Sequence, residues 1–136
     1  MHEVFEHTAD LGLRIEAGSL PDLLIEAATG LFEIIAGDLA QIRPAREERF
    51  TIPGTDPTWL LFDWTAELHA AFELRRMLFC TFSVVVNDSG LFAVAVGEPY
   101  DPAVHVLAHE IKAITQHELL VRQTPAGWLA TLIVDI

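Results

Sequence analysis

The chain has 136 residues, a formal net charge of −12 at pH 7 and 51% hydrophobic residues. This length suits a single domain over residues 1–136 with a substantial core, and the apolar content argues against disorder. No apolar run approaches the roughly 18 residues of a membrane-spanning helix, and the acidic surface argues against direct binding of nucleic acid.

Cys80 is the single cysteine, which excludes an internal disulfide and a zinc site built from cysteines. The first residues include His2, Glu3 and Glu6, where a signal peptide would need a basic flank and an apolar stretch. We therefore expect a cytoplasmic protein. Several arginines lie among acidic residues, as in residues 46–49, so the sequence forms no basic stripe.

The first elements in chain order are a strand and a helix. Alternation of apolar and polar residues over positions 11–15 predicts a strand with one face toward solvent. Apolar residues spaced by three and four then predict a helix over residues 20–35. Ser19, with Asp22 three residues later, is suited to cap the N-terminus of this helix, and Gly37 is suited to cap its C-terminus.

A second helix is predicted to begin near Asp56 and Pro57 and to run to about Phe79. Cys80 would end this helix among apolar residues, and His69 would lie at its boundary or on its surface. The inner face of the helix would be formed by Leu60, Leu61, Trp64, Leu68, Ala71, Phe72 and Arg75.

The other elements are predicted as strands joined mainly by hairpins. Residues 87–90 form a strong hairpin sequence, and residues 124–127 form a second turn. The strands are expected over residues 50–52, 82–86, 91–96, 119–123 and 128–136. We therefore expect an α+β fold in which two main α-helices accompany a largely antiparallel β-sheet or sheets.

Acidic groups lie near the two ends of the sequence. Asp10 closes a short segment that contains His7, and Asp135 directly precedes Ile136 with its α-carboxylate. If Asp10 lies beside the other two groups, three oxygen donors converge, which is the ligand type that calcium and magnesium prefer. On spacing alone, the alternative is favoured: Asp10 caps a turn and Asp135 belongs to a solvated end.

Patterns typical of an enzyme are weak. His105 and His109 are four residues apart, but no helix is indicated there and the HExxH zinc pattern is absent. The serines have no neighbouring base, so a serine hydrolase has no support. Lys112, the only lysine, is flanked by apolar residues as on a strand. It could neutralise carboxylates or meet a phosphate, or it could simply face solvent.

Five motifs occur in order along the chain: FEHTADLG (5–12), LLFDW (60–64) with EL (67–68), GE (97–98), EIKAITQH (110–117) and IVDI (133–136). Together they resemble the archease family over the whole chain. Gln116 stands where the family usually has tyrosine, and Ala66 where it usually has asparagine. Neither departure touches the acidic groups, so each bears on substrate or partner details.

The resemblance implies an accessory protein and not an enzyme. Archeases assist the GTP-dependent ligase that joins 2′,3′-cyclic or 3′-phosphate RNA ends to 5′-hydroxyl ends in tRNA splicing and RNA repair. They promote guanylylation of a histidine on that ligase, which then turns over many times. The implied metal ligands are Asp10, Asp135 and the Ile136 carboxylate, with calcium favoured over magnesium or manganese. Lys112 is the implied functional lysine, and His7 is expected to orient the Asp10 loop, or else to face core or solvent.

Two other functions stay open at this point. A metal-dependent hydrolase would hold a catalytic ion on Asp10 and Asp135 and use a histidine as base. A chaperone or modulator of an RNA-modifying enzyme, such as a methyltransferase, would not depend on Asp10. The sequence does not identify the bound metal, the RNA substrates of the ligase or the oligomeric state. It also does not distinguish a role in tRNA splicing from a role in RNA repair.

Overall fold

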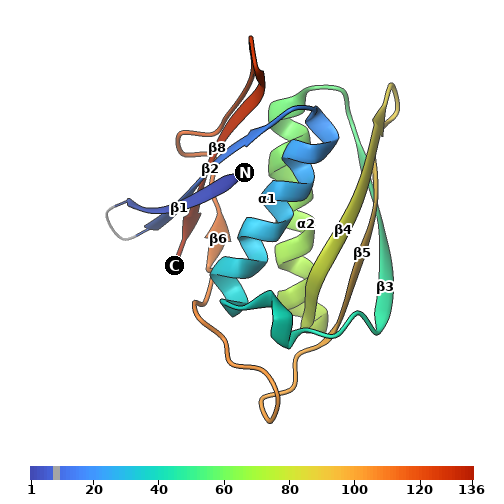
Figure 1. Ribbon diagram of the computed structural model, residues 1–136, viewed down its shortest axis with the longest axis vertical. Helices are drawn as coiled ribbons and strands as arrows, with labels where there is room; N and C mark the ends of the chain where they lie inside the picture. Colours follow the sequence, from blue (N-terminus) through green and yellow to red (C-terminus); the bar gives the residue numbers. More distant parts are fainter. Residues whose placement is uncertain (8–9) are drawn as a thin grey trace.

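Two antiparallel sheets enclose a pair of helices in the computed structural model, which describes residues 1–7 and 10–136 (Figure 1). The strands of the five-stranded sheet are β1 (His2–His7), β2 (Asp10–Ala17), β8 (Gly127–Asp135), β6 (Ala113–Ile114) and β7 (Leu120–Thr124). The strands of the three-stranded sheet are β3 (Arg46–Pro53), β5 (Gly90–Pro99) and β4 (Met77–Asn87). The helices are α1 (Leu20–Ala36), α2 (Pro57–Arg75) and the short 3₁₀-helix η1 (Leu39–Gln41). The predicted α+β class is confirmed.

Helix α1 begins and ends where its capping residues predict. The Ser19 hydroxyl accepts a hydrogen bond from the Asp22 N–H at 3.2 Å, and Gly37 follows the helix with a φ of 77°. The apolar side of α1 is buried against β2 and β4, so this helix packs on both sheets. No helix in the described part of the chain is long and apolar enough to cross a membrane.

Helix α2 ends earlier than the sequence predicts. Arg76 adopts a left-handed conformation with φ of 54° and donates its N–H to the Phe72 carbonyl at 2.8 Å, which closes the helix after Arg75. The apolar residues from Met77 to Phe79 then begin β4, where they are buried. The prediction was wrong because a short apolar run fits a buried strand as well as a helix.

The predictions for Cys80 and Arg75 were also wrong, because both assumed a longer helix α2. Cys80 lies within β4 and not at a helix end, is half-buried, and donates its thiol to the Val96 carbonyl at 3.4 Å. Arg75 does not lie on the inner face of α2. It is exposed and pairs with Glu48 at 2.6 Å, because its charge stays close to water and to a carboxylate.

The predicted hairpin at residues 87–90 is confirmed. Asn87 pairs with Gly90 across a two-residue loop, and Gly90 has a φ of 133°. A Cβ at Gly90 would lie 2.1 Å from the Ile52 carbonyl oxygen, so only glycine fits there. Strand β3 is longer than predicted because it is an edge strand, where the charged residues 46–49 can face solvent.

His2 of β1 lies between two carboxylates of α1. Its Nδ1 is 2.7 Å from Glu26 and its Nε2 is 3.0 Å from Glu33. Burial by itself would lower the pKa of His2, but the hydrogen bonds to Glu26 and Glu33 outweigh burial, so the pKa is raised. The ring therefore links the edge strand β1 to α1 through both carboxylates, and protonation of the ring strengthens this link.

The raised pKa of His2 predicts a pH dependence of stability. The protonated ring adds stability that is fully present below the ordinary pKa of 6.5 and is lost as pH rises through the higher folded value. The free energy of unfolding in urea should therefore fall as the pH is raised above 6.5, and fall less in His2→Gln. The same pH dependence in both proteins would contradict this account.

Candidate metal centre

The strand register brings the predicted acidic residues together. Asp10 of β2 pairs directly with Asp135 of β8. On the other side of β8, Ala113 of β6 pairs with Asp135, and the Lys112 N–H donates to the Asp135 carbonyl at 2.7 Å. His7 of β1 pairs with Asp10 from the outer side. Four adjacent strands thus place these residues at one end of the five-stranded sheet.

The two aspartates lie on the face of the sheet that points away from the helices. Leu11 and Val134, their neighbours along β2 and β8, are buried in the core with α1 and α2. Successive side chains of a strand point to opposite faces, so Asp10 and Asp135 point outward together. Both are half-buried, as is Ile136. Figure 1 shows the end of the chain close to the β1–β2 end of the sheet.

The donor set fits a hard divalent cation. Two carboxylates that face each other directly across neighbouring strands repel, and a cation between them would remove that repulsion. Asp10, Asp135 and the α-carboxylate of Ile136 all offer oxygen, which suits calcium, magnesium or manganese. Lys112 is exposed beside this acidic pair.

Within residues 1–7 and 10–136, no group of three or more histidine, cysteine, aspartate or glutamate side chains could hold a metal ion. The ligands predicted from the sequence are instead two aspartate side chains and the carboxylate of Ile136. The side chain of His7 and residues 8 and 9 lie outside the described part, so the role predicted for His7 stays a prediction.

In the described part of the chain, the other histidines belong to no group of three possible metal ligands. His105 is buried and bonds Glu98, and His109 donates its Nδ1 to the Ile34 carbonyl at 3.1 Å. His69 of α2 donates its Nε2 to the Ile111 carbonyl at 2.8 Å. The sequence interpretation of His69 as a boundary residue missed this contact, because no local pattern shows a bond between residues so far apart in the chain.

The two departures from the family pattern lie in separate places. Gln116 is exposed between β6 and β7, and Ala66 is half-buried on α2.

Comparisons with known proteins agree with this fold over the full chain. A model of the Archease protein family (MTH1598/TM1083) matches residues 2–136. The protein archease of Methanopyrus kandleri is 40% identical and that of Saccharolobus solfataricus 33% identical, and the alignments cover 98% of this chain and 98% and 97% of those proteins. The chain therefore belongs to the archease family.

Two solved structures have a similar fold. The solution structure of Methanobacterium thermoautotrophicum protein 1598 superposes with a TM-score of 0.81 at 28% identity, over 99% of this chain and 98% of that one. The crystal structure of a Thermotoga maritima archease, described as a possible chaperone, gives a TM-score of 0.69 at 21% identity, over 100% and 98% of the two chains. At that identity, the second likeness concerns the fold alone.

Proposed function

We propose that this protein is a metal-binding activator of a GTP-dependent RNA ligase, and not an enzyme itself. It would act in tRNA splicing or RNA repair by promoting guanylylation of the ligase, so that each ligase molecule joins many RNA ends. The observation that carries the proposal is the register of β2 and β8, which sets Asp10 opposite Asp135 next to the α-carboxylate of Ile136. Membership in the archease family supports it.

In this proposal Asp10, Asp135 and the Ile136 carboxylate hold a divalent ion, with calcium favoured and magnesium or manganese as alternatives. When bound, the ion supplies positive charge that attracts phosphate oxygens. The Lys112 ammonium would contact a phosphate or offset the negative charge of the carboxylates. His7 would orient the segment that leads to Asp10.

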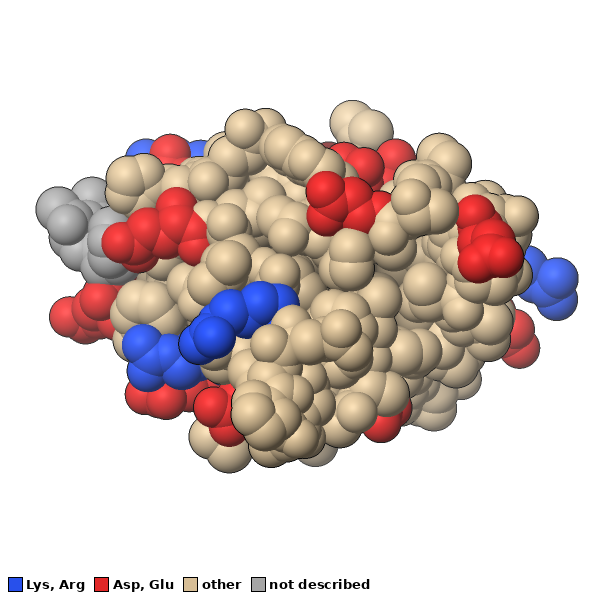
Figure 2. Space-filling view, turned by 90° about the horizontal axis from the view of Figure 1, so that it is seen from above, with Lys and Arg blue, Asp and Glu red and all other residues tan. Residues whose placement is uncertain are grey.

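The partner in this proposal is the ligase protein and not RNA. The chain has 20 acidic residues against 8 lysines and arginines, and the face shown in Figure 2 is mainly uncharged, with several separate acidic groups and fewer basic ones. Such a surface repels an RNA backbone and suits a basic protein surface. The acidic end of the sheet would dock at the ligase active site in the cytoplasm and help to place the histidine and the triphosphate in line.

A ligation assay tests the proposal, with the ligase of the same organism held well below the RNA concentration. We expect multiple turnovers when this protein is added and a single round without it. Asp10→Asn should lose most of this effect, because it removes one charged ligand while keeping the side-chain size. Asp22→Asn, at the exposed start of α1, is the matched control and should activate like wild type.

The chaperone-type modulator is the second candidate, because the Thermotoga maritima archease is described as a possible chaperone. It predicts a stable complex with an RNA-modifying enzyme, such as a methyltransferase, whose activity changes equally with wild type and Asp10→Asn. Unchanged ligase turnover, with a ligase competent for one round, would favour this candidate. Hydrolysis of a phosphoester by this chain alone would instead indicate a metal-dependent hydrolase.

A further inference from the structure

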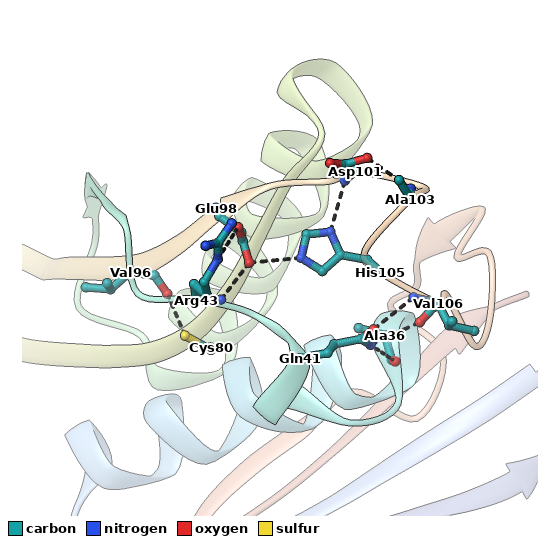
Figure 3. A network of polar contacts seen from close by, with 10 residues as sticks. All are labelled: Ala36, Gln41, Arg43, Cys80, Val96, Glu98, Asp101, Ala103, His105 and Val106. Atoms are coloured by element: carbon teal, nitrogen blue, oxygen red, sulfur yellow. Dashed lines mark hydrogen bonds and ion pairs between the residues drawn. The ribbon is translucent and has the colours of Figure 1, made fainter.

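The segment that leads to Lys112 has neither helix nor strand over residues 100–112, yet hydrogen bonds from side chains and backbone hold it at several points. Its first part is anchored by a buried pair (Figure 3). His105 accepts the Asp101 N–H on Nδ1 at 2.9 Å, so its Nε2 carries the proton and donates to Glu98 at 2.9 Å. Glu98 also accepts the backbone N–H of Arg43 at 2.7 Å.

Glu98 can accept both of these hydrogen bonds because its carboxyl group is ionised. The Arg43 N–H and the His105 ring hold the pKa of Glu98 below its usual range. Gln41 adds a second anchor in Figure 3: its Oε1 accepts the Val106 N–H at 2.8 Å, and its Nε2 donates to the Val106 and Ala36 carbonyls at 3.0 and 2.8 Å. Val106 itself is 77% exposed, so apolar burial does not hold this part of the segment.

The middle of the segment covers the C-terminal end of α1. The Ala108 N–H donates to the Ile35 carbonyl at 2.8 Å, and the His109 ring donates to the Ile34 carbonyl at 3.1 Å. These carbonyls have no partner within their own helix, so the segment satisfies them. These bonds hold the segment against the end of α1 before the chain reaches β6.

The last anchor acts on the peptide bond that joins Ile111 to Lys112. The carbonyl of this peptide accepts a hydrogen bond from His69 Nε2 at 2.8 Å, and its N–H donates to the Asp135 carbonyl at 2.7 Å. One peptide plane is therefore held on both sides, by α2 and by β8. Ile111 is only 3% exposed, so its carbonyl has little access to water as a substitute partner.

We propose that His69 is a positioning residue for Lys112: by holding the Ile111–Lys112 peptide against β8, it sets the place from which the lysine side chain reaches the acidic pair. The part that concerns ligase activation rests on the proposed function. His69 is suited to this role because its side chain is 13% exposed and is fixed on a helix. The Glu73 carboxylate also lies beside the ring, 3.5 Å from the same Nε2.

Hydrogen exchange of the free protein tests the positioning without any ligase. His69→Leu removes the donor and should make the Lys112 amide exchange about 5- to 100-fold faster, since a buried carbonyl loses its partner. His69→Gln, whose amide nitrogen can donate from a similar distance, should restore the wild-type rate. Glu73→Gln is the control and should leave that rate unchanged. Unchanged exchange of the Lys112 amide in a folded His69→Leu protein would overturn the proposal.

Ligase turnover separates positioning from a general loss of structure. His69→Leu should lower activation in the wild-type background and have no further effect when Lys112→Met is already present. An equal loss in both backgrounds would show a structural role for His69 and would overturn the proposal. Lys112→Met could activate the ligase like wild type while His69→Leu still makes the Lys112 amide exchange faster. That result would contradict the proposed role of Lys112 in activation and would support the proposal that His69 positions the Ile111–Lys112 peptide.

Discussion

Trp64→Ala is expected to lower the free energy of unfolding by about 3–5 kcal/mol. Trp64 lies on α2 between the two sheets and is fully buried. Its ring makes edge contacts with Phe50 and Phe82, with ring centres 5.4 and 6.2 Å apart. Its indole N–H donates to the Leu24 carbonyl at 2.9 Å, so alanine would leave a cavity and remove this buried hydrogen bond.

Trp59 provides the matched control, because it stands on the same helix and is 46% exposed. We expect Trp59→Ala to change the free energy of unfolding by no more than about 1 kcal/mol. Urea unfolding followed by circular dichroism measures both variants. Equal losses in the two variants would contradict the assignment of Trp64 to the centre of the core.

Adding one residue after Ile136 is expected to weaken calcium binding by roughly 100-fold or more, because ligand charge tunes calcium affinity over several decades. The extension converts the α-carboxylate of Ile136 into an amide carbonyl and moves the new charge one residue further away. One of the three oxygen ligands proposed at the end of the five-stranded sheet then loses its charge. Titration calorimetry with calcium alone measures the change.

Ile136→Val is the control for that extension. It keeps the α-carboxylate and most of the apolar contact that the half-buried Ile136 makes with the core. We expect its calcium affinity to match wild type. Wild-type affinity in the extended protein would remove Ile136 from the ligand set and leave Asp10 and Asp135 to account for any binding.

Local signals predicted a large part of the fold. Ser19 and Gly37 marked the ends of α1 because capping depends on a few neighbouring residues. The sequence of residues 87–90 predicted its hairpin for the same reason. The end of α2 could not be predicted, because the residues from Met77 to Phe79 are apolar and suit either a helix or a buried strand until the sheet is known.

The candidate site was harder to predict than the fold, because it depends on which distant residues meet in the folded chain. Spacing alone did not favour a meeting of Asp10 and Asp135, and only the family resemblance indicated it. The register of β2 with β8 now sets the two residues opposite each other. The contact of His69 with Ile111 was missed because it joins residues 42 positions apart, through the packing of a helix on a loop. Such contacts follow from tertiary structure and have no local pattern.

The most direct test of the central claim is the guanylylation of the ligase itself, measured with labelled GTP in the presence of wild-type protein or of Asp10→Asn. The account predicts that wild-type protein speeds the labelling of the ligase histidine and that Asp10→Asn, folded to the same stability, does so at least tenfold less well. Equal labelling with the two proteins would contradict the claim that the acidic end of the five-stranded sheet activates the ligase.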